Sequence, residues 1–385
     1  MFGVLYDVAM RASKGKVLVA MSGGVDSSVA AALLKDDGYE VVGCFMRLGS
    51  PGESLEQDED DQACSVDSSK KAKIGHQGCC SINDAKDAQL VAANLDIPFY
   101  VLNFKRDFGR IIDYFVSEYN AGRTPNPCVR CNDWLKFGKL ADYARSIDAD
   151  YVATGHYARV EEVDGERALL RGVDLSKDQS YVLFGSQREH LRHMMLPIGG
   201  YEKPEIRKIA SEIGLLVSNK PDSQEICFVP TGDYKDVLRE RSPASIEPGE
   251  IRHVNGDVLG RHGGHQNYTI GQRRGVGVAV GEPIYVVDKN PADNSVIVGS
   301  KQDLACSQLT ALQTNWLVSY QDGESIECQA KIRYNANPVP AIVTPTGEDQ
   351  MIVQFDTPQF AVAPGQAVVC YDGDRVLCGG WISKS

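Results

Sequence analysis

The chain has 385 residues, of which 43% are hydrophobic and 24% are charged, and its formal net charge at pH 7 is −12. This length exceeds one ordinary hydrophobic core and predicts two or three domains, and the composition excludes disordered and fibrous classes. No apolar run approaches the about 20 residues that span a bilayer, and Asp7 interrupts the faintly apolar start, so we expect a cytoplasmic protein without signal peptide or membrane contact. The acidic charge taken alone argues against a nucleic-acid partner, although a local basic face can coexist with it.

The first half of the chain alternates short buried strands with helices. Strands are predicted at 16–21 and 40–48, and the helix between them is expected to end at Gly38. A polar insertion at 50–78 follows, which is interpreted as an inserted loop or a disordered segment. Helices are then predicted at 83–95, 108–122 and 134–147, and strands at 98–104 and 150–160. This alternation predicts an α/β fold with a parallel sheet.

The second half of the chain differs in composition and in predicted secondary structure. Beyond about Pro230, glycine and proline become frequent and short β-like runs replace helices. We expect a small β-rich central domain, and six short runs separated by turn residues from about Leu304 onward predict an antiparallel barrel or sandwich.

The chain contains eleven cysteines, an odd count at low density. In a reducing compartment these are thiols, metal ligands or catalytic groups rather than a disulfide framework. The polar insertion contains Cys64, Cys79 and Cys80, which the pattern does not place. Five others are expected to be buried as small hydrophobic side chains: Cys44, Cys306, Cys328, Cys370 and Cys378.

The segment SGGVDSS, residues 22–28, lies between the first strand and the first helix. Two glycines allow a sharp turn, and the helix N-terminus behind them attracts anions, so this loop is expected to bind phosphate. It lacks the lysine of kinase-type P-loops, and Asp26 would repel phosphate unless Mg²⁺ bridged the two. The motif resembles that of the ATP pyrophosphatases, which implies that it holds the pyrophosphate of ATP.

Three further residues are expected at the same edge of the sheet, where ligands of parallel α/β folds bind. Met46 near the end of the second strand is interpreted either as a surface for adenine or as core. Gly155 would let a base or ribose approach the backbone, and the neighbouring His156 is equally well explained as a structural or a binding residue.

The loop TPNPCVRCN, residues 124–132, presents Cys128 and Cys131 in a CxxC pair. A structural zinc site would need a second pair of ligands, which is not evident, so a zinc site is disfavoured. We expect the next helix to start near residues 132–133, which places Cys131 at a helix N-terminus. With Arg123, Arg130 and Lys136 nearby, this setting would lower the pKa of the Cys131 thiol. In PDSQEICFV, Cys227 taken by itself is interpreted as a core thiol, whereas beside Cys131 it is the natural partner thiol.

At this point the chain resembles the tRNA-specific 2-thiouridylase family across nearly its whole length. The resemblance rests on SGGVDSS, AGRTPNPCVRCN followed by LKFG, ATGHYA, KDQSYVLF, PDSQEICFV, GQRRG, KIRY and PGQAVV, in this order. It implies a Rossmann-like ATP pyrophosphatase domain at 1–230, a β-rich central domain at 231–303 and a C-terminal antiparallel β-barrel at 304–385. It also implies ATP binding by Ala20, Met21, Ser22, Gly23, Gly24, Val25, Asp26, Ser27, Met46 and Gly155.

The resemblance further implies a reaction on the C2 oxygen of the wobble uridine, which is adenylated and replaced by sulfur. Cys227 would carry the sulfur as a persulfide, received from a sulfur-relay protein or a cysteine desulfurase, and Cys131 would be its partner. Contacts with the anticodon loop of tRNA are implied for Asn126, Pro127, Cys128, His156, Lys177, Asp178, Gln179, Arg333, Tyr334 and Gln366. Neither DNA nor a membrane is an expected partner.

One position departs from the family pattern, because many members have aspartate where this chain has Cys128. The acid/base role of that aspartate passes here to the thiol, to another group or to none. Three cysteines at 128, 131 and 227 are alternatively interpreted as ligands of an Fe–S cluster with one open iron.

Two other functions remain as alternatives. An amidotransferase-type synthetase would need an ammonia source, yet no glutaminase domain is evident and the cysteine pair would be unexplained. A non-catalytic tRNA- or metal-binding protein would not need an intact SGGVDS loop. Arg261, Arg273 and Arg274 form a basic cluster that is expected to meet phosphates.

Overall fold

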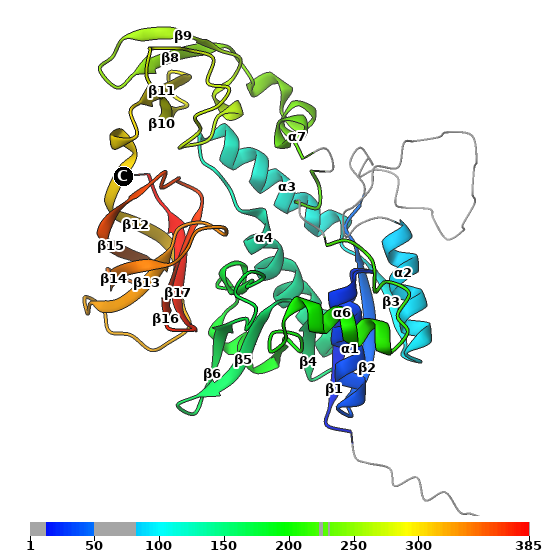
Figure 1. The fold of residues 1–385 in the computed structure, drawn as a ribbon. Helices are drawn as coiled ribbons and strands as arrows, with labels where there is room; N and C mark the ends of the chain where they lie inside the picture. Colours follow the sequence, from blue (N-terminus) through cyan, green and yellow to red (C-terminus); the bar gives the residue numbers. More distant parts are fainter. Residues whose placement is uncertain (1–12, 50–81, 223–225, 230–231, 385) are drawn as a thin grey trace, which may run out of the picture.

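The structure is a computed structural model that describes residues 13–49, 82–222, 226–229 and 232–384. Figure 1 shows an N-terminal α/β part, a small β-rich part around β8–β11 and a C-terminal barrel. The predicted fold class is therefore confirmed. The insertion at 50–78, with Cys64, and the pair Cys79 and Cys80 lie outside the described residues.

A five-stranded parallel sheet forms the centre of the N-terminal part, in the order β3-β2-β1-β4-β7. Its strands are β1 (Lys16–Ala20), β2 (Glu40–Arg47), β3 (Phe99–Asn103), β4 (Tyr151–Thr154) and β7 (Met194–Met195). The helices that cover it are α1 (Val25–Asp36), α2 (Ile82–Asn94), α3 (Lys105–Asn120), α5 (Leu140–Ser146) and α6 (Lys203–Glu212).

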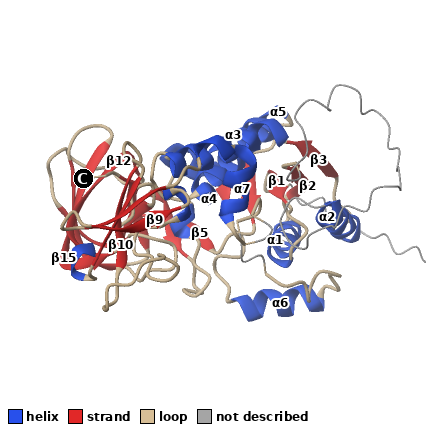
Figure 2. Cartoon of the chain, turned by 90° about the horizontal axis from the view of Figure 1, so that it is seen from above, coloured by secondary structure: helices blue, strands red, loops and turns tan. Residues whose placement is uncertain are grey.

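Alternation along β1 divides the core into two hydrophobic clusters, because successive side chains of a strand point to opposite faces. Leu18 packs with residues of α3 and α5, whereas Val17 and Val19 pack with residues of α1, α2 and α6. Figure 2 shows these two sets of helices on opposite sides of the sheet. All five strands present their carboxyl ends at one edge, which is where the SGGVDSS loop lies.

The predicted strand at 150–160 is wrong in its second half. β4 ends at Thr154, and after Gly155 the chain enters β5 (Ala158–Val163), which pairs with β6 (Glu166–Arg171) in a different sheet. A continuous apolar pattern hides this break, because both halves are buried on their own sheets. The break places residues 155–157 at the ligand edge of the parallel sheet.

A continuous helical segment follows the TPNP loop, in place of the helix predicted from residue 134. It begins as α4 (Pro127–Arg130), continues as a π-helix, η2 (Cys131–Lys139), and ends in α5. A π-helix within an α-helix is rare and often marks a functional site. Short 3₁₀ turns form η3 (Ser180–Val182), η4 (Arg188–His193), η5 (Pro243–Ser245), η6 (His265–Asn267) and η7 (Gln302–Leu304).

The remaining strands form the two β-rich parts. After α7 (Tyr234–Arg241), a four-stranded sheet has the order β10-β11-β8-β9. Its strands are β8 (Gly249–His253), β9 (Val258–His262), β10 (Tyr285–Asn290) and β11 (Ser295–Gly299). The C-terminal strands are β12 (Ala305–Trp316), β13 (Ile326–Lys331), β14 (Val339–Pro345), β15 (Gln350–Phe360), β16 (Ala367–Asp372) and β17 (Arg375–Ile382).

Pairing of β12 with β17 closes the C-terminal strands into an antiparallel barrel rather than a sandwich. The β5–β6 hairpin joins this barrel through the pair Leu170–Arg375, so the N-terminal part and the barrel share one sheet. Cys370 and Cys378 are buried in the barrel core, as Cys44 is in the parallel sheet, which confirms their predicted burial. Cys306 and Cys328 are only partly buried, so that expectation is wrong for them.

Candidate functional site

The loop between β1 and α1 is shaped to present backbone N–H groups to a ligand. Gly24 is the N-cap of α1, and Gly23 has a φ of 73°, a conformation that favours glycine. A Cβ atom on Gly23 would lie 2.2 Å from the carbonyl oxygen of Asp84, so no larger residue fits there. The Ser27 hydroxyl accepts a hydrogen bond from the N–H of Ser22 at 3.1 Å and fixes the turn. Together with the helix dipole, this geometry favours an anion.

Gly155 approaches this loop from the neighbouring strand. β1 and β4 pair in parallel, with Ala20 opposite Thr154 at their last residues. A Cβ atom on Gly155 would lie 2.5 Å from the backbone nitrogen of Ser27. The close approach of the two backbones therefore depends on glycine at this position. Met46, on β2, is partly buried and packs against the hydrophobic cluster that contains Leu18.

Lysine side chains from distant parts of the chain supply the positive charge that the SGGVDSS motif lacks. The Lys203 ammonium group lies 2.8 Å from Asp26 and 2.8 Å from Asp222. The Lys220 ammonium group donates to the carbonyl oxygen of Gly23 at 2.9 Å and contacts Asp84 at 2.6 Å. These lysines were missed in the sequence, because 177 and 197 residues separate them from their partners in the loop and no local motif marks them.

The carboxylates in this network hold it together. Asp222 accepts from Lys203, Lys177 and Arg207. Burial alone would raise the pKa of its carboxyl group, but Lys203 and Lys177 lower that pKa to about 2. The Tyr157 hydroxyl donates to Asp26 at 2.7 Å. Burial, followed by the charge of Asp26, raises the pKa of that phenol far above its usual range. The edge of the sheet is therefore a dense set of paired charges around the phosphate loop.

His156 lies beside Gly155 and is only 7% exposed. Its Nδ1 atom is 2.6 Å from the Thr154 hydroxyl, and its Nε2 atom is 3.3 Å from the Lys136 ammonium group. Burial, followed by the positive charge of Lys136, lowers the pKa of His156 well below its usual value. The imidazole is therefore neutral at pH 7.

The CxxC pair lies on the first turns of the helical segment α4–η2. Asn126 is the N-cap, and its side-chain oxygen accepts from the N–H of Cys128 at 3.2 Å. The predicted N-cap at 132–133 is wrong, since Asn132 is buried and donates to the carbonyl oxygen of Val182. Consequently Cys128, rather than Cys131, lies in the first turn. Cys128 is exposed, and Cys131 is partly buried at the start of the π-helix.

The three basic residues near the pair have other partners. The guanidinium group of Arg123 pairs with Glu118, and Lys136 contacts His156. Arg130 lies over the rings of Trp381, Trp134 and Tyr114 and so connects this helix to the barrel.

Cys227 is brought to the same hydrophobic cluster as Cys131. Its neighbour Phe228 packs edge-to-face on Phe108 and Phe115 of α3, and both cysteines pack against that cluster. Within the described part of the chain, no three His, Cys, Asp or Glu side chains lie close enough together to hold a metal ion. The three cysteines therefore do not fit a cluster site in this arrangement.

The end of β13 brings the KIRY segment to the cysteine loop. The Tyr181 hydroxyl donates to the carbonyl oxygen of Ala367 at 2.9 Å, and the Tyr181 ring centroid lies 6.2 Å from that of Tyr334. Burial raises the pKa of the Tyr334 phenol, and negative charge at Asp178 and Cys128 adds to this effect. Burial raises the pKa of the Tyr181 phenol, and the positive charge of Arg333 partly offsets this effect. Tyr334, from the segment after β13, thus lies near Cys128 and beside Tyr181.

Gln366 holds the TPNP loop itself. Its side-chain amide donates to the carbonyl oxygens of Thr124 at 3.0 Å and Pro125 at 3.3 Å. The N–H of Thr124 in turn donates to the carbonyl oxygen of Pro364 at 2.7 Å. The barrel therefore fixes the backbone that leads into Pro127 and the CxxC pair.

The KDQ segment, residues 177–179, is engaged inside the protein. The Asp178 carboxylate is buried, accepts from the N–H groups of Gly172 and Ser180, and pairs with Arg171 at 3.3 Å. Gln179 accepts from the N–H of Tyr157 at 2.9 Å, and Lys177 pairs with Asp222 at 2.9 Å. These bonds support residues 155–157, so a direct contact of this segment with tRNA stays a prediction.

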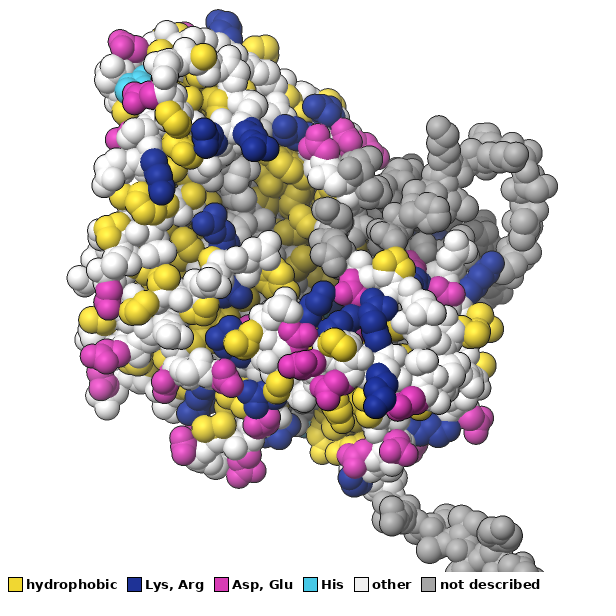
Figure 3. All heavy atoms as spheres, viewed as in Figure 1, with side chains coloured by type: hydrophobic (Ala, Val, Ile, Leu, Met, Phe, Trp, Pro, Cys, Tyr) yellow, Lys and Arg dark blue, Asp and Glu magenta, His cyan; other side chains and the backbone are white. Residues whose placement is uncertain are grey.

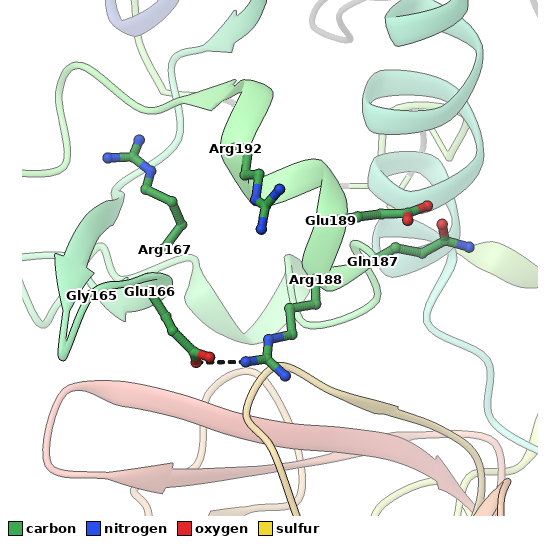
Figure 4. A pocket seen from close by; sticks show the side chains of 7 residues that line it. All are labelled: Gly165, Glu166, Arg167, Gln187, Arg188, Glu189 and Arg192. Atoms are coloured by element: carbon green, nitrogen blue, oxygen red, sulfur yellow. Dashed lines mark ion pairs between the residues drawn. The ribbon is translucent and has the colours of Figure 1, made fainter.

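The surface in Figure 3 is hollowed between the barrel and the helical part, with dark blue lysine and arginine side chains along the walls. Arg261, Arg273 and Arg274 are all exposed on the central part. A separate cavity of about 730 Å³ lies at the tip of the β5–β6 hairpin (Figure 4). The residues that line it are Gly165, Glu166, Arg167, Gln187, Arg188, Glu189 and Arg192. None of them is a candidate site residue. No helix among the described residues is long and apolar enough to cross a membrane.

Comparison with known proteins gives family matches along most of the chain. Residues 15–231 match a tRNA methyl transferase HUP domain, residues 235–300 a tRNA methyl transferase PRC-barrel domain, and residues 306–382 an aminomethyltransferase beta-barrel domain. The chain is 49% identical to the tRNA-specific 2-thiouridylase MnmA of Rhodopirellula baltica, over 96% of each chain. It is also 49% identical to the protein of that name from Carboxydothermus hydrogenoformans, over 96% of this chain and 98% of the relative. The chain therefore belongs to the tRNA-specific 2-thiouridylase family.

Proposed function

We propose that this chain uses ATP and Mg²⁺ to replace the C2 oxygen of the wobble uridine in tRNA with sulfur. The observation that supports the proposal is that Gly155 and His156 link the phosphate loop to the helix of Cys131, while Cys131 and Cys227 pack against one hydrophobic cluster. Such an arrangement allows one bound base to meet both the nucleotide and a thiol.

In the first step the C2 oxygen of uracil attacks the α-phosphate of ATP. A bond forms between that oxygen and phosphorus, and pyrophosphate leaves with the electron pair of the broken bond. Residues 20–27 hold the leaving pyrophosphate, with Lys203 and Lys220 as nearby cations. Asp26 is the carboxylate in the loop that suits Mg²⁺ together with phosphate oxygens. Met46 and Gly155 are assigned to the adenine and ribose side.

In the second step the terminal sulfur of a Cys227 persulfide attacks C2, and the oxygen leaves with AMP. The Cys131 thiolate then attacks the remaining S–S bond, which leaves the new sulfur on the base and forms a Cys131–Cys227 disulfide. A dithiol reductant restores the two thiols by exchange. A sulfur-relay protein or a cysteine desulfurase is the proposed persulfide donor, and the arrangement of the cysteines favours this route over an Fe–S cluster.

The tRNA would bind in the hollow between the barrel and the helical part. Asn126, Pro127 and Cys128 would face the extruded base, since base access to C2 requires unstacking from its neighbours. Other proposed contacts come from the α/β part and from the C-terminal barrel. They are His156, Lys177, Asp178, Gln179, Arg333, Tyr334 and Gln366. Tyr334 offers a partly exposed ring on which a base can stack.

The test uses the whole protein with ATP, Mg²⁺, bulk tRNA, and a cysteine desulfurase with cysteine as the persulfide donor, followed by mass analysis of nucleosides and assay of pyrophosphate. Cys131→Ser and Cys227→Ser should release pyrophosphate with tRNA but form no 2-thiouridine. Cys306→Ser is the matched control, because Cys306 is a partly buried thiol on the barrel. Full thiolation by either site variant would overturn the assignment of the cysteines. Absence of tRNA-dependent pyrophosphate release from the unaltered protein would overturn the proposed function.

A further inference from the structure

Lys136 is a half-buried cation at the candidate site, and no carboxylate in the described part of the chain pairs with it. Its ammonium group lies 3.3 Å from His156 Nε2. By contrast, Lys177, Lys203 and Lys220 each contact an aspartate. A half-buried positive charge without a counter-ion is costly, and a bound anion would offset that cost.

The His156 contact positions Lys136 without neutralising it. A lysine ammonium group is only a donor, so Nε2 of His156 accepts from it and Nδ1 carries the proton that is shared with the Thr154 hydroxyl, 2.6 Å away. The imidazole is thereby fixed in one tautomer and one orientation. It directs the ammonium group to the edge of the sheet and leaves its charge intact.

Lys136 also connects the two halves of the site. Thr154 pairs with Ala20 at the end of β1, and the residue between Thr154 and His156 touches the backbone of Ser27. On the other side, Lys136 lies five residues after Cys131 on the π-helix. Hydrogen bonds in a π-helix join residues i and i+5, so Lys136 lies one turn beyond Cys131. Its ammonium group is therefore between the phosphate loop and the cysteine helix.

We propose that Lys136 is a further catalytic residue, whose ammonium group contacts the α-phosphate during adenylyl transfer and again when AMP leaves. This inference rests on the proposed function. In the first step the bond from the α-phosphorus to pyrophosphate breaks as the bond to the uracil oxygen forms. The ammonium group of Lys136 stabilises the negative charge on the non-bridging oxygens of the α-phosphate during this step. In the second step the same cation stabilises the AMP phosphate as the C2–O bond breaks. Lys203 and Lys220 remain with the leaving pyrophosphate.

The kinetic test compares Lys136→Met with Lys139→Met, an exposed lysine on the same π-helix. Release of pyrophosphate is measured in a single turnover, with ATP present and the enzyme in excess over tRNA. Loss of one aligned donor should slow this step about 10²- to 10³-fold in Lys136→Met and leave Lys139→Met unchanged. Lys136→Arg, which keeps the charge, should recover part of the rate. An unchanged rate in Lys136→Met, with the unaltered protein active, would overturn this inference and leave the proposed function standing.

Two further measurements, the pKa of His156 and the affinity for tRNA, distinguish a contact of Lys136 with the α-phosphate from a contact with the tRNA backbone or a fold defect. The pKa of His156, followed by NMR, should rise in Lys136→Met because the neighbouring cation is gone, and should not move in Lys139→Met. An unmoved pKa would contradict the contact itself. Affinity for tRNA in the absence of ATP should be the same in both variants. A fall in that affinity confined to Lys136→Met, with normal pyrophosphate release from the bound complex, would assign Lys136 to tRNA and overturn the α-phosphate role.

Discussion

The ammonium group of Lys203 lies 2.8 Å from the carboxylate of Asp26, and this ion pair joins helix α6 to the first turn of α1. Asp26 would otherwise repel the phosphates of ATP. A lysine that pairs with this carboxylate is well placed to turn to the phosphates when Mg²⁺ takes over the carboxylate. The pair thus offsets a charge conflict that the SGGVDSS motif creates.

Replacement of Lys203 by methionine should therefore slow ATP turnover. We expect tRNA-dependent pyrophosphate release to fall about 10²-fold, since one aligned cation is lost from the phosphate site. Lys208→Met is the control, because Lys208 lies on the same helix and pairs with Glu212 at the surface. Equal rates in the two variants, measured by a coupled pyrophosphate assay, would contradict the role of Lys203.

The parallel sheet and the phosphate loop were predictable because their signals are local. Strand and helix periods, two glycines and a following helix are all contained within about twenty residues of β1. Lys203 and Lys220 were not predictable, since a lysine at a helix start or in a loop carries no mark of the distant aspartate that it meets. The same limit hid the break at Gly155, where an unbroken apolar pattern continues from one sheet into another.

The helix start at Pro127 was missed for a different reason. Asn126-Pro127 is a good N-cap and first-turn pair, but the second proline at 125 favoured a rigid loop as the interpretation. The cap bond from Asn126 to the N–H of Cys128 shows that the helix begins earlier. As a result, Cys128 occupies the first helical turn that was predicted for Cys131.

Asp222→Asn should destabilise the protein in a pH-dependent way. The cations around Asp222 lower its pKa to about 2 in the folded state, compared with about 3.9 in an unfolded chain. The stabilisation that the ionised Asp222 carboxylate contributes is therefore present above pH 4 and is lost as the pH falls toward 2. After allowance for solvent screening, we expect the free energy of unfolding at pH 7 to fall by about 1 kcal/mol.

Urea unfolding of the two proteins across pH 7 to pH 2.5 tests this. The difference in free energy of unfolding should shrink as the pH falls. Asp142→Asn removes an exposed pair with Arg145 and should change little at any pH. A difference that stays constant down to pH 2.5 would show that Asp222 acts through packing rather than charge.

Gly155→Ala should impair nucleotide binding while the rest of the fold persists. The added Cβ atom would lie 2.5 Å from the backbone nitrogen of Ser27, a separation at which one backbone must move. We expect ATP affinity, measured by calorimetry, to fall at least about tenfold, since displacement of the loop spoils the alignment of its N–H groups. Gly200→Ala is the control, because its added Cβ meets no atom within 4 Å. Unchanged affinity in Gly155→Ala would show that the loop tolerates the shift.

Cys128→Asp should stabilise the protein and retain thiolation. Cys128 is exposed in the first turn of α4, and the Asn126 cap bonds to its backbone rather than to its thiol. A carboxylate at that position interacts favourably with the helix N-terminus, so the free energy of unfolding should rise by about 0.5 kcal/mol. Cys128→Lys, which places a positive charge at the same point, should lower it by a similar amount.

The activity of the aspartate variant then decides the role of Cys128. If the aspartate that the family resemblance implies at this position serves the same reaction, a carboxylate should be compatible with it. Retained 2-thiouridine formation in Cys128→Asp, together with loss of it in Cys128→Ala, would mean that the site needs an ionisable group there. Loss of thiolation in the aspartate variant alone, with normal pyrophosphate release, would contradict the prediction, because the thiol of Cys128 would then carry chemistry that a carboxylate cannot replace.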